Sequence, residues 1–109
     1  MTRAATAADR RLDELIEEAT VDAHDESEQA VGFHAVIEEN VAFPFRTEVL
    51  GIELSVTGVD MRDDDRVVAI CKRGRQTQHI DLADLPLPSQ PPAGAEWIAA
   101  YWRWSRSSG

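Results

Sequence analysis

The sequence is poor in the features that identify secreted, membrane and thiol-dependent proteins. Cys71 is the single cysteine, so no disulfide can form within the chain and no thiolate cluster can bind a metal. No stretch approaches the roughly 20 apolar residues of a membrane-spanning helix. Residues 1–11 lack the apolar run of a secretory signal. We therefore expect a cytoplasmic protein.

Basic residues are scarce, and they are unevenly placed. The chain has 11 Lys and Arg against 20 Asp and Glu, a net charge of −9. Residues 9–65 hold 17 of the acids and four arginines, whereas residues 66–109 hold six basic and three acidic residues. An acidic surface disfavours nucleic acids and anionic membranes as partners. Crowded carboxylates repel one another, so they indicate either solubility or a bound cation.

Length and composition favour one folded unit. A chain of 109 residues suits one domain. Its 43% hydrophobic residues and three tryptophans exceed what a disordered acidic chain contains. We expect residues 1–8 to form a flexible N-terminal arm and residues 9–106 to form a single α+β domain.

Apolar residues recur at helical spacing in three segments. The spacing predicts a first helix over residues 9–19, with Thr6 and Asp9 as a capping pair, a second over 25–41 and a last one over 93–105. The expected buried positions are Leu12, Leu15, Ile16, Ala19, Ala30, Phe33, Ile37, Val41, Trp97, Ile98, Tyr101 and Trp104. Gly32 interrupts the second helix, and its missing side chain would let another backbone or an ion come close.

Between the second and last helices the pattern is that of strands. We predict strands over residues 47–50, 52–56, 67–72 and 77–82, with a bend at Gly51 and a polar loop over 60–65. The predicted fold class is therefore α+β, with two N-terminal helices, a small curved antiparallel (SH3-like) sheet of about four strands, and a C-terminal helix.

A first group of acids surrounds the second predicted helix. Calcium takes about six to eight oxygen ligands, which carboxylates, carbonyls and water supply. Residues 25 and 39 lie about 21 Å apart along a helix, so one ion cannot contact both ends. Glu26 shares the apolar side of the helix and is expected to face inward, whereas Asp25 and Glu28 also fit an N-terminal capping pair. The candidates are Asp22, Asp25, Glu26, Glu28, Glu38 and Glu39.

A second group of acids lies in the predicted loop. Its candidates are Asp60, Asp63 and Asp65. The loop is not an EF-hand, because Arg62 and Cys71 stand where that motif needs an acid. An aspartate-rich turn between strands is also typical of a simple solvated loop.

Other chemistry has little support in the sequence. His24 and Glu28, like His34 and Glu38, are four residues apart, but a transition-metal site needs more nitrogen or sulfur ligands. Cys71 follows an apolar run and is expected to be a buried hydrophobe. No nucleophile or phosphate-binding motif is present, so we expect a protein that is not an enzyme.

Several of these segments resemble one family. Residues 20–28, Ile37-Glu-Glu-Asn-Val-Ala-Phe-Pro-Phe45, Val68-Ala-Ile-Cys-Lys-Arg-Gly74 and the proline-rich run into Gly94-Ala-Glu-Trp-Ile98 are similar to small acidic calcium-binding proteins of the CcbP type. The resemblance covers about residues 12–104. It implies a cytoplasmic Ca²⁺ buffer or sensor without an EF-hand. Carried over by position, it implies ligands among Asp22, Glu26, Glu28, Glu38 and Glu39, with the loop acids Asp60, Asp63 and Asp65.

A different class of function is also compatible with the sequence. An SH3-like sheet beside an acidic helical surface would suit a protein-interaction module that binds a basic protein partner. Salt would weaken such binding and a calcium chelator would not, so the two hypotheses are separable.

Overall fold

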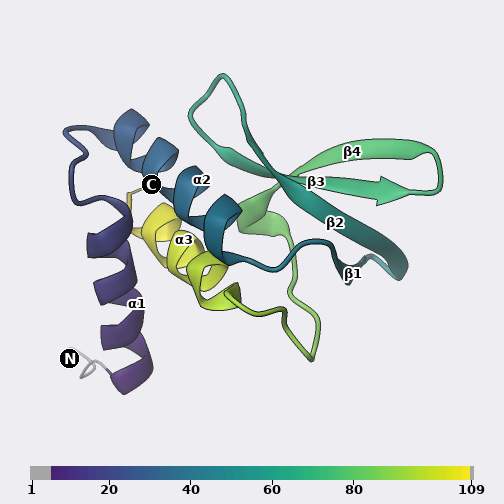
Figure 1. The fold of residues 1–109 in the computed structure, drawn as a ribbon, viewed down its shortest axis with the longest axis horizontal. Coiled ribbons are helices and arrows are strands. Elements are labelled where there is room, and N and C mark those ends of the chain that lie inside the picture. Colours follow the sequence, from purple (N-terminus) through teal and green to yellow (C-terminus); the bar gives the residue numbers. More distant parts are fainter. Residues whose placement is uncertain (1–5, 109) are drawn as a thin grey trace.

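The chain folds with its helices at one end and a sheet at the other (Figure 1). The computed structural model describes residues 6–108. Its elements are α1 (Ala7–Ala19), α2 (Glu26–Asn40), β1 (Phe45–Val49), β2 (Ile52–Met61), β3 (Val67–Arg73), β4 (Gln76–Asp81), a 3-10 turn η1 (Leu82–Asp84) and α3 (Ala95–Ser108). This order confirms the predicted α+β fold class.

The N-terminal boundary differs slightly from the prediction. The Asp9 amide donates to Thr6 Oγ1 at 3.0 Å, and the Thr6 amide donates to Asp9 Oδ2 at 3.1 Å. This reciprocal capping starts α1 at Ala7, so residues 7 and 8 are helical although they belong to the arm predicted over residues 1–8. Residues 1–5 of that arm lie outside the described residues.

The sheet is an antiparallel meander in the order β1-β2-β3-β4, so β1 and β4 are its edges. The β2–β3 register shifts between Val56 and Gly58, which is a bulge. Strand β2 continues to Met61, so Asp60 lies in a strand and not in the predicted loop, which shortens to residues 62–66. Pairing with Val68 of β3 holds Asp60 there.

The bend predicted at Gly51 is a tight hairpin turn. Val49 pairs with Ile52, which leaves Leu50 and Gly51 as the two turn residues. Both have positive φ, 51° and 78°, as in the type I′ turns whose twist suits a hairpin. Glycine adopts this conformation readily, whereas leucine does so at a cost.

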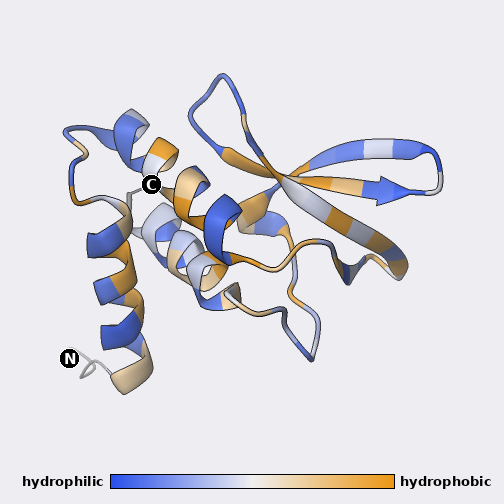
Figure 2. Cartoon of the chain, viewed as in Figure 1, coloured by the Kyte–Doolittle hydropathy of each residue, from blue (hydrophilic) through white to orange (hydrophobic). Residues whose placement is uncertain are grey.

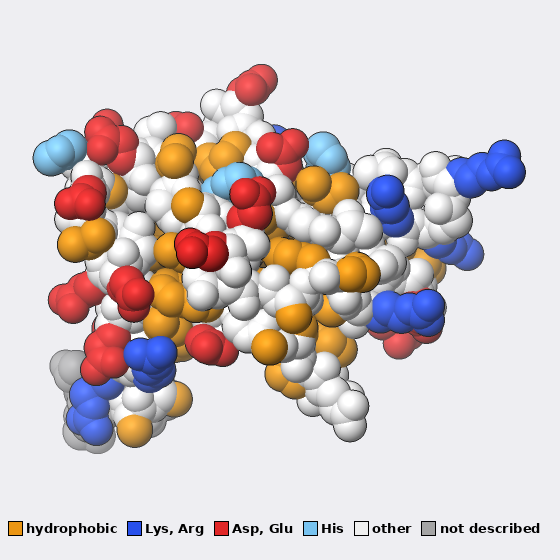
Figure 3. Space-filling model, in the orientation of Figure 1, with side chains coloured by type: hydrophobic (Ala, Val, Ile, Leu, Met, Phe, Trp, Pro, Cys, Tyr) orange, Lys and Arg blue, Asp and Glu red, His pale blue; other side chains and the backbone are white. Residues whose placement is uncertain are grey.

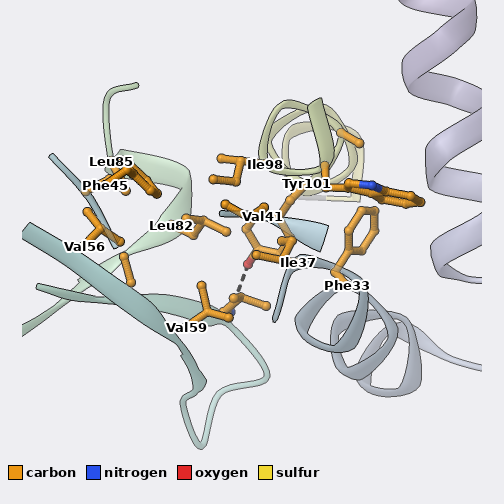
Figure 4. Packing of buried hydrophobic residues seen from close by; sticks show 14 of the residues in the cluster. Phe33, Ile37, Val41, Phe45, Val56, Val59, Leu82, Leu85, Ile98 and Tyr101 are labelled. Atoms are coloured by element: carbon orange, nitrogen blue, oxygen red, sulfur yellow. Dashed lines mark hydrogen bonds between the residues drawn. The ribbon is translucent and has the colours of Figure 1, made fainter. Parts of the chain in front are cut away.

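The helices pack in layers against part of one face of the sheet. Helix α2 lies against β2 and β3, α3 packs beside α2, and α1 packs outside them against α3 and α2. Apolar colour follows β2, β3 and the facing sides of the helices, whereas the β2–β3 and β3–β4 loops are hydrophilic (Figure 2). Phe33, Ile37 and Val41 meet Ile98 and Tyr101 in this core (Figure 4).

The predicted helix stripes are confirmed. Leu15, Ala19, Ala30, Phe33, Ile37, Val41, Trp97, Ile98 and Tyr101 are buried, and Leu12, Ile16 and Trp104 pack against the core as partly buried residues. Cys71 is a buried free cysteine, as predicted, and burial raises the pKa of its thiol. No helix within residues 6–108 has the length and apolar character to cross a membrane.

Tyr101 joins the three main parts of the core. Its ring lies edge-on to Phe33 of α2, with 5.5 Å between ring centroids. Its hydroxyl accepts a hydrogen bond from the Val67 amide at the start of β3, at 3.1 Å. Burial raises the pKa of this phenol, so it stays neutral. One side chain of α3 therefore fixes both α2 and the sheet.

Gly32 permits a close approach of two helix segments. A Cβ built on Gly32 would lie 2.1 Å from the carbonyl oxygen of Ala19, the last residue of α1. Of the two neighbours expected at this glycine, another backbone or an ion, the structure has a backbone.

We predict that Tyr101→Phe lowers the free energy of unfolding by about 1–3 kcal/mol, because it leaves the buried Val67 amide without its partner. Urea denaturation measures the change. Thr57→Ala is the control, since it removes an exposed hydroxyl bonded to the Ile70 carbonyl and should change stability by less than about 0.5 kcal/mol. Equal effects of the two variants would contradict this role of Tyr101.

We predict that Gly32→Ala destabilises the protein by about 1–3 kcal/mol through overpacking against Ala19. Helix propensity alone would give the opposite sign, a gain of about 1 kcal/mol. Thermal and urea unfolding decide the sign. Val31→Ala, at the exposed neighbouring position on α2, should be almost neutral. A stabilised Gly32→Ala variant would show that the helices do not meet here.

We predict that Leu50→Asn raises the free energy of unfolding by about 1 kcal/mol, because asparagine tolerates positive φ and forms the preferred Asn-Gly turn. Urea denaturation again provides the measurement. Gly51→Ala places a Cβ at φ 78° and should be destabilising. A less stable Leu50→Asn variant would argue against this turn geometry.

Candidate metal site

The two acidic groups of the sequence meet at the start of α2. Ser27 Oγ, in the first turn of α2, donates to Asp65 Oδ1 in the β2–β3 loop at 3.0 Å. Asp65 has a positive φ of 62°, a conformation that aspartate tolerates better than most residues. The contact joins segments 38 residues apart in sequence. It brings the loop acids next to the N-terminus of a helix, where negative charge is favourable.

A hollow of about 190 Å³ lies at this junction. Glu26 and the loop residues Asp64, Asp65 and Arg66 form one part of its wall, and Tyr101, Trp104 and Ser105 of α3 form the other. Trp104 is held in place by its indole N–H, which donates to Gln29 Oε1 at 2.9 Å. The hollow thus has carboxylates over an aromatic wall.

Glu26 does not face the core as predicted. Its side chain is exposed, because the first turn of α2 extends beyond the apolar contact that begins at Ala30. It lines the hollow instead. The helical spacing predicted the side of α2 on which Glu26 lies. It could not predict how much of that side packs against the core.

Two arginines beside the hollow are already paired. Arg62 binds Asp64 through two hydrogen bonds, at 2.8 and 3.3 Å, and the hydrogen bond from Arg62 lowers the pKa of the Asp64 carboxyl. Arg66 pairs with Asp81, which raises the pKa of its guanidinium. Within residues 6–108, neither Asp63 nor Asp65 has an ion-pair partner. Negative charge in the loop therefore remains unneutralised.

The alternative role predicted for Asp25 and Glu28 is confirmed. Asp25 is the N-cap of α2, and its Oδ1 accepts from the Glu28 amide at 2.9 Å. Glu28 Oε2 in turn accepts from the His24 amide at 3.3 Å, one residue before the cap. Both carboxylates also contribute negative charge next to the Ser27–Asp65 contact.

The remaining candidates lie elsewhere. Asp22 is exposed in the α1–α2 connection, where it lines a separate shallow hollow with Val21 and Glu28. Glu38 lies 3.6 Å from His34 Nε2, and that nitrogen is also 3.2 Å from the Val59 carbonyl. Glu39 is exposed at the C-terminal end of α2. The structure therefore separates Glu38 and Glu39 from the loop acids, as the length of the helix required.

The donor types at the junction suit a hard cation. Carboxylate oxygens are among the ligands that calcium prefers. In the part of the chain that the structure describes, no three Asp, Glu, His or Cys side chains converge closely enough to hold a metal ion. Carboxylates alone thus do not form a complete shell here, and a calcium shell would include carbonyl oxygens or water, as it commonly does.

Sequence reasoning missed the residues that complete the hollow. Ser27 and Arg66 carry no ligand signature, and Trp104 lines the hollow in addition to packing against the core as predicted. An acidic cap followed by serine is a common helix start, so nothing in the sequence indicated that Ser27 would bond to a loop 38 residues away. Only the fold identifies these neighbours.

Fold and hollow together define a small acidic α+β protein with an oxygen-rich site. Comparison with known structures agrees. Anabaena CcbP is 21% identical, with a TM-score of 0.73 over 94% of this chain and 95% of that one. A structure described as a calcium binding protein in the calcium-binding form is 19% identical, with a TM-score of 0.72 over 94% of this chain and 97% of that one. These likenesses show the same fold.

The sequence comparison identifies the family. The model of the CcbP family, described as calcium binding, matches residues 13–105. The chain therefore belongs to the CcbP family of calcium-binding proteins, as the resemblance noted in the sequence predicted. No curated protein matches the sequence.

Proposed function

We propose that this protein binds Ca²⁺ at the junction of α2 and the β2–β3 loop, and that it acts as a cytoplasmic calcium buffer or sensor without an EF-hand. The observation that carries the proposal is the Ser27–Asp65 contact, which brings two acidic segments together. Membership of a calcium-binding family supports the identity of the ion. The proposed carboxylate ligands are Glu26 and Asp65, with Asp63 next to them in the loop.

The other predicted acids have supporting roles in this proposal. Asp22, Asp25, Glu28 and Asp60 increase the local negative potential, which raises the local concentration of a divalent cation. Glu38 and Glu39 belong to a separate position at the far end of α2, about 21 Å away along the helix axis. We propose a weaker, second cation position there.

Charge relief would link calcium to stability. Like charges crowded at the junction lower the stability of the calcium-free protein, and a bound divalent ion removes that repulsion. Because calcium binds the folded state, the melting temperature should rise with free calcium by mass action. Magnesium should compete poorly, since it retains its water and requires a tighter octahedral shell.

We predict that the double variant Glu26→Gln, Asp65→Asn weakens calcium binding at least about tenfold, or about 1.4 kcal/mol. Calorimetric titration in physiological salt with excess Mg²⁺ measures it. Asparagine retains the positive φ that residue 65 needs, so the fold should persist. The matched control is Glu17→Gln, Glu18→Gln, which removes the same charge from exposed positions on α1.

Three results would separate the hypotheses. Absence of heat and of any thermal shift with millimolar calcium would exclude calcium binding by the wild-type protein. Equal weakening in the site variant and the α1 variant would show that net charge, not this junction, attracts the ion. A calcium-dependent change in Trp104 fluorescence, lost in Trp104→Phe and retained in Trp102→Phe, would favour an ion at the hollow that Trp104 lines.

A further inference from the structure

The apolar inner face of the sheet extends beyond the helices that cover it. Strand alternation places Leu54, Cys71 and Ile80 on the side that faces the core. Helix contacts are made by β2 and β3 near the β2–β3 loop, and the two hairpin tips project away from all three helices (Figure 1). The distal part of the inner face is therefore left uncovered by the helices.

This uncovered part forms a groove of about 220 Å³, which we call the sheet groove. Leu54 and Cys71 are buried in its floor, and Ile80 is partly buried beside them. Its rim includes Leu50, Ile52 and Arg73. An apolar concavity with one charged group at its edge is the usual character of a binding site.

Leu50 is an unusual residue at the rim. Its side chain is 97% exposed, although it is a large hydrophobe, and its φ of 51° is unfavourable for any residue with a branched side chain. Ile52, across the same turn, is 42% exposed. The tip of this hairpin is coloured hydrophobic in Figure 2. Neither folding nor solubility explains a leucine here, whereas a partner that buries it would.

The charge around the sheet groove is opposite to that of the rest of the molecule. Residues 67–80 contain Lys72, Arg73 and Arg75 and no acid. On the neighbouring hairpin, Glu48 and Glu53 lie on the outer face of the sheet, and Glu53 binds Arg46 at 2.8 Å. Blue side chains gather at the sheet tips, and red ones over the helices (Figure 3). The groove therefore complements an acidic ligand.

The open edge of the sheet indicates the form of that ligand. Strand β4 is an edge strand, and Gln76, Gln78 and Ile80 along it line the groove. Residues 76–81 include no proline or lysine, the residues that commonly protect an edge from further pairing. An extended peptide can lie along such an edge and direct alternate side chains into an adjacent hollow.

We propose that the sheet groove binds an extended acidic peptide segment of another protein. One large apolar side chain of the peptide occupies the groove against Leu50 and Ile52, and a neighbouring carboxylate pairs with Arg73. A two-fold contact with a second copy is disfavoured, because it would bring two basic hairpin tips together. The partner's charge is thus opposite to that of the basic partner predicted from the acidic helical surface.

Selection of a displayed random peptide library on the full chain tests the proposal. We expect enriched sequences in which a large apolar residue stands beside Asp or Glu. A synthetic peptide of the enriched sequence should bind at least about tenfold more weakly to Leu50→Asn and to Arg73→Glu. Binding should also weaken as salt rises. Arg106→Glu makes the same charge change on the exposed last turn of α3 and should retain wild-type affinity.

The variants make the outcomes decisive. Leu50→Asn suits the turn, so loss of binding in this variant cannot be attributed to unfolding. No enrichment on the wild type over a Leu50→Asn, Arg73→Glu double variant would overturn the proposal, as would enriched peptides that are basic. A concentration-dependent dimer, seen by sedimentation and lost in Leu50→Asn, would instead assign the groove to self-association. Calcium titration of the same variants should match the wild type, which separates this proposal from that for the junction.

Discussion

The hydroxyl of Tyr101 and the ring that carries it hold the two ends of this protein together. The ring packs on Phe33 and Trp104, and the hydroxyl accepts the buried amide of Val67. Helix α2, helix α3 and strand β3 are fixed by these contacts. Since β3 follows the β2–β3 loop directly, the same hydrogen bond sets where the acids of that loop lie relative to α2. The candidate metal site is a consequence of core packing.

The distribution of charge divides the molecule into two halves of opposite sign. The helical half concentrates carboxylates, and the loop arginines beside the junction are neutralised by Asp64 and Asp81. The distal sheet carries basic residues around an apolar groove. Strand β3 (Val67–Arg73) separates the two signs by roughly 20 Å, at about 3.3 Å per residue. Ionic screening acts over about 8 Å, so the distal basic residues have little effect on a cation at the candidate metal site.

The elements themselves could be predicted from sequence because each has a local cause. The Thr6–Asp9 capping pair and the Asp25 cap mark helix starts, and the apolar periods of α1, α2 and α3 mark their buried sides. Period-two segments separated by Gly51 mark the first hairpin. Two predictions were wrong. Glu26 does not face the core, because it lies beyond the part of α2 that packs there. Asp60 is not in the loop, because pairing with Val68 keeps it in β2. Both depend on where a neighbouring segment ends.

The fold class, the family and the excess of carboxylates can be predicted without a structure, since they follow from local periodicity, motif spacing and composition. Tertiary structure decided which carboxylates are neighbours. Asp65 meets Ser27 because the meander returns β3 beneath α2, whereas Glu38 and Glu39 remain at the other end of a rigid helix. The tertiary structure also shows that the inner face of the sheet extends beyond the part that the helices cover. Contacts between residues far apart in the chain depend on packing of the whole core, and no local pattern encodes them.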